Sequence, residues 1–184
     1  RQRQMCIRDR GVARTFQHIR LFESLSVLDN LLVGQDTHLH SSWLDALLGS
    51  RRMRREERTA RARALATLAL FGPDLVARQH EMAAQLAYAD KRRVEICRAL
   101  VAEPHLLLLD EPTAGMNEDE TQSLLAVLRR ICTERHLTLL LIEHKLAAIA
   151  AVDQVIALDQ GHVIAIGTPA EVRQNDQVIA AYLG

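Results

Sequence analysis

The sequence is short of the features that mark several common classes of protein. Its 23 basic and 23 acidic residues cancel, which removes any general electrostatic argument for nucleic-acid binding. Its three cysteines, Cys6, Cys97 and Cys132, are scattered without CxxC spacing, so we expect a reducing compartment and neither a disulfide framework nor a zinc site. No apolar run approaches the roughly 20 residues that span a bilayer, and we expect no signal peptide. If the protein acts at a membrane, we expect it to act from the cytoplasmic face, through a partner.

Apolar residues make up 48% of the 184-residue chain, and the most informative apolar run is Leu106–Leu109. Followed directly by Asp110 and Glu111, it predicts a strand buried on both faces inside a parallel sheet. Pro112 ends the strand, which places both carboxylates at the carboxyl edge of the sheet, where open α/β folds bind ligands. One carboxylate can hold Mg²⁺ and the next can polarise an attacking water. Taken alone, the run fits a buried strand with a solvated acidic turn equally well.

A second apolar run, Leu137–Ile142, also ends in a charged pair, Glu143 and His144. Between the two runs, Asn117 is expected to cap a helix whose first turn is acidic. A buried strand, a helix and a second buried strand form a βαβ unit, which predicts a parallel sheet.

Local sequence signals predict most of the remaining elements. They indicate a short strand ending near Gln17, a helix over 27–33 capped by Ser26, a helix over 51–71, a helix over about 90–102 with Val94, Cys97, Leu100 and Val101 facing inward, a hairpin over 154–166 on the edge of the sheet, and a helix begun by the capping box Thr168–Glu171.

Three features have competing interpretations. Residues 1–10 (RQRQMCIRDR) are read as a ragged start rather than a basic arm for nucleic acid. His38 and His40 are expected to be solvated in a polar loop rather than to bind a metal. The 51–71 helix is rich in arginine, and a solvated face is favoured over a nucleic-acid or lipid patch.

Four elements in a fixed order give the chain a family resemblance. Gln17 in Arg-Thr-Phe-Gln matches a Q-loop, Leu86–Asp90 a signature motif, Leu106–Glu111 a Walker B strand with its catalytic glutamate, and His144 a switch histidine. Each match is weak alone, but the ordered set resembles the nucleotide-binding subunit of an ABC transporter. The likeness narrows to branched-chain amino-acid or amide/urea uptake systems on four further stretches: Ala13–His18, Arg92–Ile96, Ala114–Asn117 and Ala181–Gly184.

The resemblance implies an α/β fold with a P-loop NTPase-like parallel sheet core and an inserted α-helical subdomain. Residues 1–22 would be a remnant of the ATPase core that carries the Q-loop. Residues 23–98 would be the helical subdomain, ending in the signature helix. Residues 99–184 would complete the ATPase core.

The resemblance also implies ATP and Mg²⁺ as cofactors and assigns roles to residues. Asp110 and Gln17 would hold the metal, Glu111 would be the general base and His144 would hydrogen-bond the γ-phosphate. Nucleotide on a second ATP-binding subunit would be contacted by Leu86, Ala87, Tyr88, Ala89 and Asp90. A D-loop crossing to that subunit would comprise Ala114, Gly115, Met116 and Asn117. Further implied partners are transmembrane permease subunits and, indirectly, a solute-binding protein, but no nucleic acid.

The chain departs from the family pattern in two respects. Ala87 stands where a serine is usual and Ala89 where a glycine is usual, so a hydroxyl is lost and a β-carbon is added where backbone approaches a phosphate. There is also no GxxxxGK[ST] motif, and the only lysines, Lys91 and Lys145, lie outside any glycine-rich loop. We therefore expect an altered signature and an N-terminally truncated subunit, without the P-loop and first strands, that is inactive alone.

Two functions stay open on the sequence. One is an ATPase subunit that powers solute uptake, and the other is a non-hydrolysing ABC-like interaction module that pairs with a complete ATPase subunit. An ABC-type protein of DNA repair or translation is disfavoured, because the sequence has no heptad insertion, no fused second cassette and no net positive charge.

Overall fold

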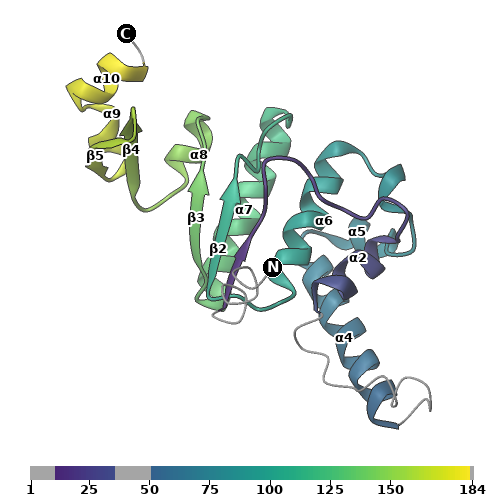
Figure 1. The fold of residues 1–184 in the computed structure, drawn as a ribbon. Coiled ribbons are helices and arrows are strands. Elements are labelled where there is room, and N and C mark those ends of the chain that lie inside the picture. The colour runs from purple at the N-terminus through teal and green to yellow at the C-terminus, as the bar shows by residue number, and fades with distance from the viewer. Residues whose placement is uncertain (1–10, 36–50, 183–184) are drawn as a thin grey trace. The chain divides into compact units, whose positions relative to one another are not determined.

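The computed structural model describes residues 11–35 and 51–182 of the chain (Figure 1). The stretch 1–10 and the histidines His38 and His40, with the predictions made for them, lie outside the described residues. The chain divides into two compact units, Arg1–Ile142 and Glu143–Gly184, and each is described by itself. No helix in the described ranges is long and apolar enough to cross a bilayer.

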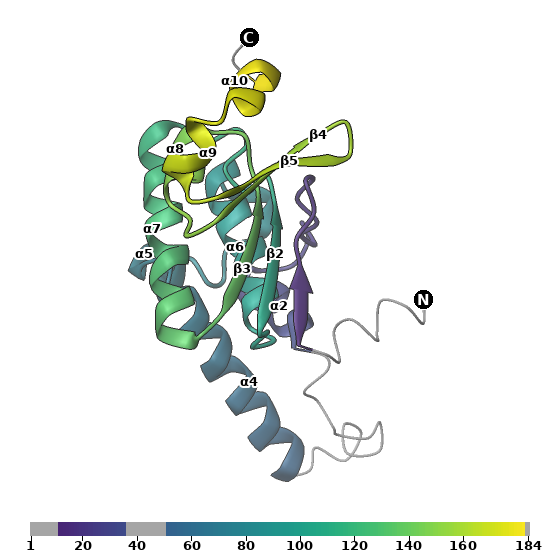
Figure 2. The same ribbon diagram turned by 90° about the vertical axis from the view of Figure 1, so that its left-hand side faces the viewer.

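The first unit is built on a parallel sheet. Within the described ranges its strands are β1 (Val12–Arg14), β2 (Leu106–Asp110) and β3 (Thr138–Ile142), in the order β1-β2-β3 (Figure 2). Both pairings are parallel, and α7 (Glu118–Arg135) connects β2 to β3. The predicted βαβ unit is confirmed, and the helix begins at the predicted cap, Asn117.

The prediction that the two apolar strands are buried on both faces is wrong: β2 is buried on one face, and no residue of β3 is fully buried. Leu107 and Leu109 are buried in the core with residues of α6 and α7, whereas Leu106 and Leu108 on the other face of β2 are only partly buried. On β3 the exposure continues at Leu140, which is 48% exposed. The reason is that α6 and α7 pack on one face of the sheet among the described residues. An apolar run does not reveal how many of its faces are covered.

A group of helices precedes β2 in the chain. It comprises α2 (Val27–Gly34), α4 (Arg51–Ala69), α5 (Pro73–Ala77), the 3₁₀ turn η2 (Ala83–Gln85) and α6 (Tyr88–Leu100). Ser26 caps α2 as predicted, its hydroxyl accepting from the Asp29 backbone N–H at 3.1 Å. Helices α2 and α6 pack closely at Gly34, where an added β-carbon would lie 2.6 Å from the Arg98 carbonyl oxygen.

The predicted inward face of α6 is confirmed. Val94, Cys97, Leu100 and Val101 are all buried, and burial raises the pKa of the Cys97 thiol. Each fully buried side chain of this size contributes about 1.5–3 kcal/mol. The helix begins at Tyr88, two residues before the predicted start.

The arginine-rich helix α4 has one face exposed to solvent. Its buried positions are Ala60, Ala64, Thr67 and Leu68, on one side of the helix. Most of its arginines are exposed, and ion pairs one turn apart join Arg52 to Glu56 and Arg61 to Glu57. Such exposed pairs contribute little to stability, about 0.3–0.5 kcal/mol each.

The second unit contains α8 (Leu146–Ala150), β4 (Val155–Asp159), β5 (His162–Gly167), α9 (Pro169–Arg173) and α10 (Asp176–Tyr182). The predicted hairpin is confirmed, with Gln160 and Gly161 at positive φ in its turn. It forms a two-stranded antiparallel sheet within this unit, and because the two units are described separately, its predicted place at the edge of the main sheet stays a prediction. The tight turn brings the two strands together, so that they pair with each other. The capping box between Thr168 and Glu171 is present as predicted.

Candidate nucleotide site

The acidic pair lies at the carboxyl end of the central strand. Asp110 is the last residue of β2, and the Glu111 backbone N–H donates to the Ile142 carbonyl at 2.9 Å, one step beyond the ladder. Glu111 itself has φ +44°, in the left-handed region that non-glycine residues rarely occupy. Such a conformation costs on the order of 1–3 kcal/mol and is concentrated at functional sites.

Parallel pairing of β1 with β2 brings Gln17 to the same edge. The Thr15 backbone N–H donates to the Leu108 carbonyl at 3.0 Å, and the chain then passes the end of β2. The Gln17 side-chain amide donates to Glu111 Oε2 at 3.3 Å, across 94 residues of sequence. Two of the predicted site residues are therefore in direct contact.

Asp110 has a neighbour that the sequence analysis missed. Arg14 Nη2 lies 3.5 Å from Asp110 Oδ2, and both side chains are partly open to solvent. Arg14 pairs in register with Leu108, so its position opposite the acidic end of β2 follows from the parallel register. A guanidinium at this point is a competing cation for any metal that Asp110 binds.

The predicted signature residues open helix α6. Ala87 occupies the N-cap with no side-chain cap bond, and Tyr88 is the exposed first helical residue. Ala89 is only 8% exposed and belongs to the hydrophobic core, so its β-carbon faces inward rather than outward to the helix end. Leu86 is buried beside it.

The charge of Asp90, in the first turn of α6, is offset by two arginines. Arg78 Nη1 lies 2.7 Å from Asp90 Oδ2, and Arg93 Nη1 lies 3.4 Å from Oδ1. Hydrogen bonds and charge from Glu81, and then from Asp90, raise the pKa of Arg78. The Asp90 carboxylate at the N-terminus of α6 therefore lies in a network that contains both acidic and basic side chains.

The predicted D-loop forms a tight turn beside the signature residues. Gly115 has φ +73°, and an added β-carbon there would lie 3.1 Å from the Tyr88 ring. Met116 is 7% exposed, and Asn117 caps α7 through a reciprocal box with Glu120. The start of α6 and the D-loop are therefore neighbours within one chain. The predicted crossing of this loop to a second subunit stays a prediction.

His144 is exposed and lies in the second unit, between β3 and α8. Its backbone N–H donates to the Glu143 carboxylate at 3.3 Å. Because the two units are described separately, the predicted meeting of His144 with Glu111 stays a prediction.

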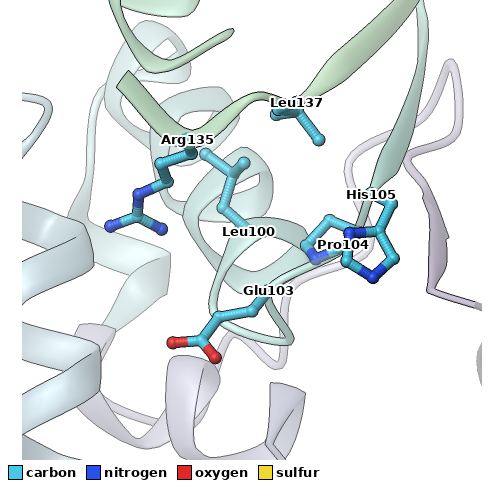
Figure 3. A pocket seen from close by; sticks show the side chains of 6 residues that line it. All are labelled: Leu100, Glu103, Pro104, His105, Arg135 and Leu137. Carbon is cyan, nitrogen blue, oxygen red and sulfur yellow. The ribbon is translucent and has the colours of Figure 1, made fainter. Parts of the chain in front are cut away.

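A hollow of about 420 Å³ lies elsewhere on the first unit (Figure 3). Its lining includes His105 and Leu137, which directly precede β2 and β3, so it lies at the amino ends of the strands. The predicted site residues lie at the carboxyl ends. The hollow is therefore not part of the candidate site.

The edge residues fit Mg²⁺ better than they fit the phosphate chain of a nucleotide. Among the described residues no group of three or more His, Cys, Asp or Glu side chains forms a metal cluster. Mg²⁺ characteristically uses one or two protein ligands and completes its shell with water and phosphate oxygens, which matches Asp110 at the strand end and Gln17 in contact with the adjoining Glu111. The glycine-rich lysine loop that holds phosphates in P-loop proteins is absent from the sequence.

The fold is that of an ATP-binding cassette. The structure of MJ1267 in its ADP conformation, an ATP-binding cassette of an ABC transporter, matches with a TM-score of 0.77 at 26% identity, covering 97% of this chain and 70% of that one. The ABC transporter family profile matches residues 1–114. The profile for branched-chain amino acid ATP-binding cassette transporters matches residues 162–184. The chain belongs to the ABC transporter family, a family of ATP-hydrolysing transporter subunits.

Two relatives indicate which kind of ABC transporter subunit the chain resembles in sequence. The chain is 41% identical over 175 residues to the high-affinity branched-chain amino acid transport ATP-binding protein LivG of Salmonella typhimurium. It is 40% identical over 176 residues to the corresponding protein BraF of Pseudomonas aeruginosa. Both matches cover 95% of this chain and 68% of the relative, so the chain spans about two thirds of their length.

Proposed function

We propose that the chain is the ATP-hydrolysing subunit of an importer of branched-chain amino acids. The observation that carries the hydrolytic role is the contact between the Gln17 amide and Glu111 at the carboxyl edge of the sheet. The solute is proposed from LivG and BraF, which are named for branched-chain amino acid transport and match nearly the whole chain.

The proposed chemistry uses the edge residues in distinct roles. Glu111 accepts a proton from the attacking water, and its left-handed backbone turns it out of the strand at that point. Asp110 and Gln17 would hold Mg²⁺, which would supply positive charge to offset the charge on the phosphate oxygens. His144 donates a hydrogen bond to the γ-phosphate.

The proposed assembly has two ATP-binding subunits beneath transmembrane permease subunits, on the cytoplasmic face of the membrane. In it, residues 86–90 meet nucleotide on the second subunit through the N-terminus of α6, where free backbone N–H groups favour an anion. Residues 1–22 and 99–184 form the ATPase core, and 23–98 form the helical subdomain. A solute-binding protein delivers the amino acid to the permease, and nucleic acid has no part.

Uptake measurements on the complete transporter in vesicles test this function. We expect ATP-dependent uptake of labelled leucine, isoleucine and valine, with at least about a hundredfold loss in the Glu111→Gln variant because the general base is removed. Glu134→Gln, an exposed carboxylate near the end of α7, is the matched control and should transport normally.

Two results would contradict the proposal. Preference for an amide or urea over the branched-chain amino acids would correct the solute. Full uptake in Glu111→Gln would assign hydrolysis to another subunit and favour the interaction-module alternative.

A further inference from the structure

Helix α6 contains a charge pair that is removed from solvent. The side chains of Arg92 and Glu95 are 0% and 2% exposed, and Arg92 Nη1 lies 2.8 Å from Glu95 Oε2. Burying two charges costs several kcal/mol per ion, and further hydrogen bonds to the two side chains are needed to offset this cost.

The partner of this pair is the backbone around Gln17. Arg92 Nη1 donates to the Phe16 carbonyl at 2.9 Å, and Nη2 donates to the Gln17 carbonyl at 2.6 Å. Glu95 Oε1 accepts from the Arg20 backbone N–H at 3.0 Å. The pair therefore holds residues 16–20 through three backbone groups.

These bonds use only the backbone of Gln17, so its side chain can contact another residue. The side-chain amide donates to Glu111 Oε2, as described above, while the backbone carbonyl accepts from Arg92. The backbone anchor therefore determines where the amide lies relative to the end of β2.

We propose that the Arg92–Glu95 pair is a positioning clamp that makes helix α6 and residues 16–20 move as one body. Through Gln17, the clamp positions the groups at the edge of the sheet that carries Asp110 and Glu111. This inference rests on the proposed function for its catalytic consequence, but the clamp itself is a property of the fold.

The clamp has a place in the proposed dimer because of where α6 begins. Tyr88, at its start, lies four residues before Arg92, or about 6 Å along the helix axis. In the proposed assembly that start meets nucleotide on the second subunit, whereas Gln17 meets nucleotide on its own. A rigid connection between them links the occupancy of the two sites.

Arginine suits this connection better than lysine. Its planar fork of donors reaches two carbonyls and a carboxylate together, whereas a lysine ammonium is a single point charge on a flexible stem. Replacing both charges by methionine fills a similar volume, and buried pairs replaced in this way often keep or gain stability. The double variant Arg92→Met/Glu95→Met therefore removes the clamp while the helix stays packed.

Hydrogen exchange on the 184-residue chain tests the clamp without any need for activity. We expect the Arg20 amide, whose N–H donates to Glu95 Oε1, to exchange at least about tenfold faster in the double variant, with the amides of β2 and α7 unchanged. Arg130→Met is the control, because Arg130 Nη2 also donates to a backbone carbonyl, that of Leu70 at 2.6 Å, but far along the chain from Gln17. Unchanged exchange at the Arg20 amide, or equal acceleration throughout the chain, would overturn the proposal.

Arg92→Lys is the second variant and keeps a positive charge beside Glu95. If the double variant does not fold, faster exchange of the Arg20 amide in Arg92→Lys supports the clamp, and wild-type exchange of that amide overturns it.

The Mg²⁺ dependence of ATP turnover in the complete transporter tests the catalytic consequence. We expect the half-saturating Mg²⁺ concentration to rise at least about threefold in either clamp variant, while Arg130→Met keeps the wild-type value. A lowered maximal rate with unchanged Mg²⁺ dependence would show a merely structural pair and overturn the positioning role. A wild-type transporter without ATP turnover would instead defeat the proposed function, and the exchange result would still stand.

Discussion

At the scale of single residues, the site depends on how Glu111 leaves its strand. Strand β2 runs regularly through Asp110, and Glu111 then takes a left-handed conformation with φ +44° while its N–H still bonds to Ile142. Successive strand residues point to opposite faces. The left-handed turn breaks that alternation and allows the carboxylate to meet Gln17.

Arg14 provides a prediction at this scale. Its guanidinium lies 3.5 Å from Asp110, where it would compete with Mg²⁺ for the carboxylate in the proposed metal site. We expect Arg14→Met in the complete transporter to lower the half-saturating Mg²⁺ concentration by up to about fivefold, since an exposed ion pair contributes at most about 1 kcal/mol. A titration of the ATP turnover rate with Mg²⁺ measures this half-saturating concentration.

Arg20→Met is the control for that experiment, since both arginines lie over the Phe16 ring but only Arg14 is paired with Asp110. An increase in the half-saturating concentration would show that Arg14 supports the metal site instead of competing with it.

At the scale of helices and strands, the caps decide where elements begin. Ser26, Asn117 and Thr168 each cap a helix through the side chain, and all three were visible in the sequence. Helix α6 differs, because Ala87 at its N-cap has the extended backbone of a cap residue but no oxygen to accept a hydrogen bond.

We therefore expect Ala87→Ser to stabilise the chain. A serine hydroxyl in this extended conformation can accept from the backbone N–H groups of the first turn, which raises the unfolding free energy by about 1 kcal/mol. A gain of this size corresponds to a rise in Tm of about 2–4 °C for a chain of this length, which thermal unfolding resolves.

Ala66→Ser is the matched control, since Ala66 is exposed in the interior of α4. There the same substitution should lower stability by a few tenths of a kcal/mol, to about 0.5 kcal/mol. Equal shifts in both variants would contradict the capping explanation.

Glu171 gives a prediction about pH. Hydrogen bonds from the Thr168 backbone N–H and hydroxyl lower the pKa of its carboxyl below the ordinary value of 4.5. Because the folded pKa is lowered, the ionised carboxylate stabilises the α9 cap above the unfolded pKa, and this contribution is lost as pH falls through the folded pKa. An NMR titration of the side-chain carboxyl should show the lowered value.

Thr168→Val removes the hydroxyl donor but keeps the backbone N–H, so the pKa of Glu171 should move part of the way back. A wild-type titration at the ordinary value would contradict the capping box as the cause.

The sequence predicted local structure better than it predicted burial or long-range pairing. Caps and turns depend on neighbouring residues, so Asn117 and the 160–161 turn could be identified directly. Coverage of the second face of β2 depends on distant elements, and there the prediction was wrong. The Arg92–Glu95 pair was missed because charges three residues apart usually lie on a helix surface. Arg92 lies three residues after buried Ala89 and four before buried Ile96, and this helical spacing could have placed its side chain on the inward face of α6.

At the scale of the whole molecule, strand order accounts for the site. Parallel pairing of β1, β2 and β3 brings chain segments from positions 17 and 110–111 to one edge. The sequence predicted the acidic edge from the apolar run alone, but the contact with Gln17 needed the family resemblance.

The 184-residue chain by itself is expected neither to bind ATP tightly nor to hydrolyse it. Its sequence has no glycine-rich loop with a lysine to hold the β- and γ-phosphates. Isothermal titration calorimetry with Mg-ATP should therefore detect no binding at micromolar concentrations. A micromolar Kd for the chain alone would show that residues already present can hold the nucleotide.

The most direct test of the central claim is the ATP turnover rate of the complete transporter carrying Glu111→Gln, with nucleotide-dependent dimerisation measured on the same preparation. The account predicts that turnover falls by at least about a hundredfold while ATP still drives the dimer together, because the variant loses the base but keeps the binding edge. Undiminished turnover would contradict it and remove Glu111 as the general base.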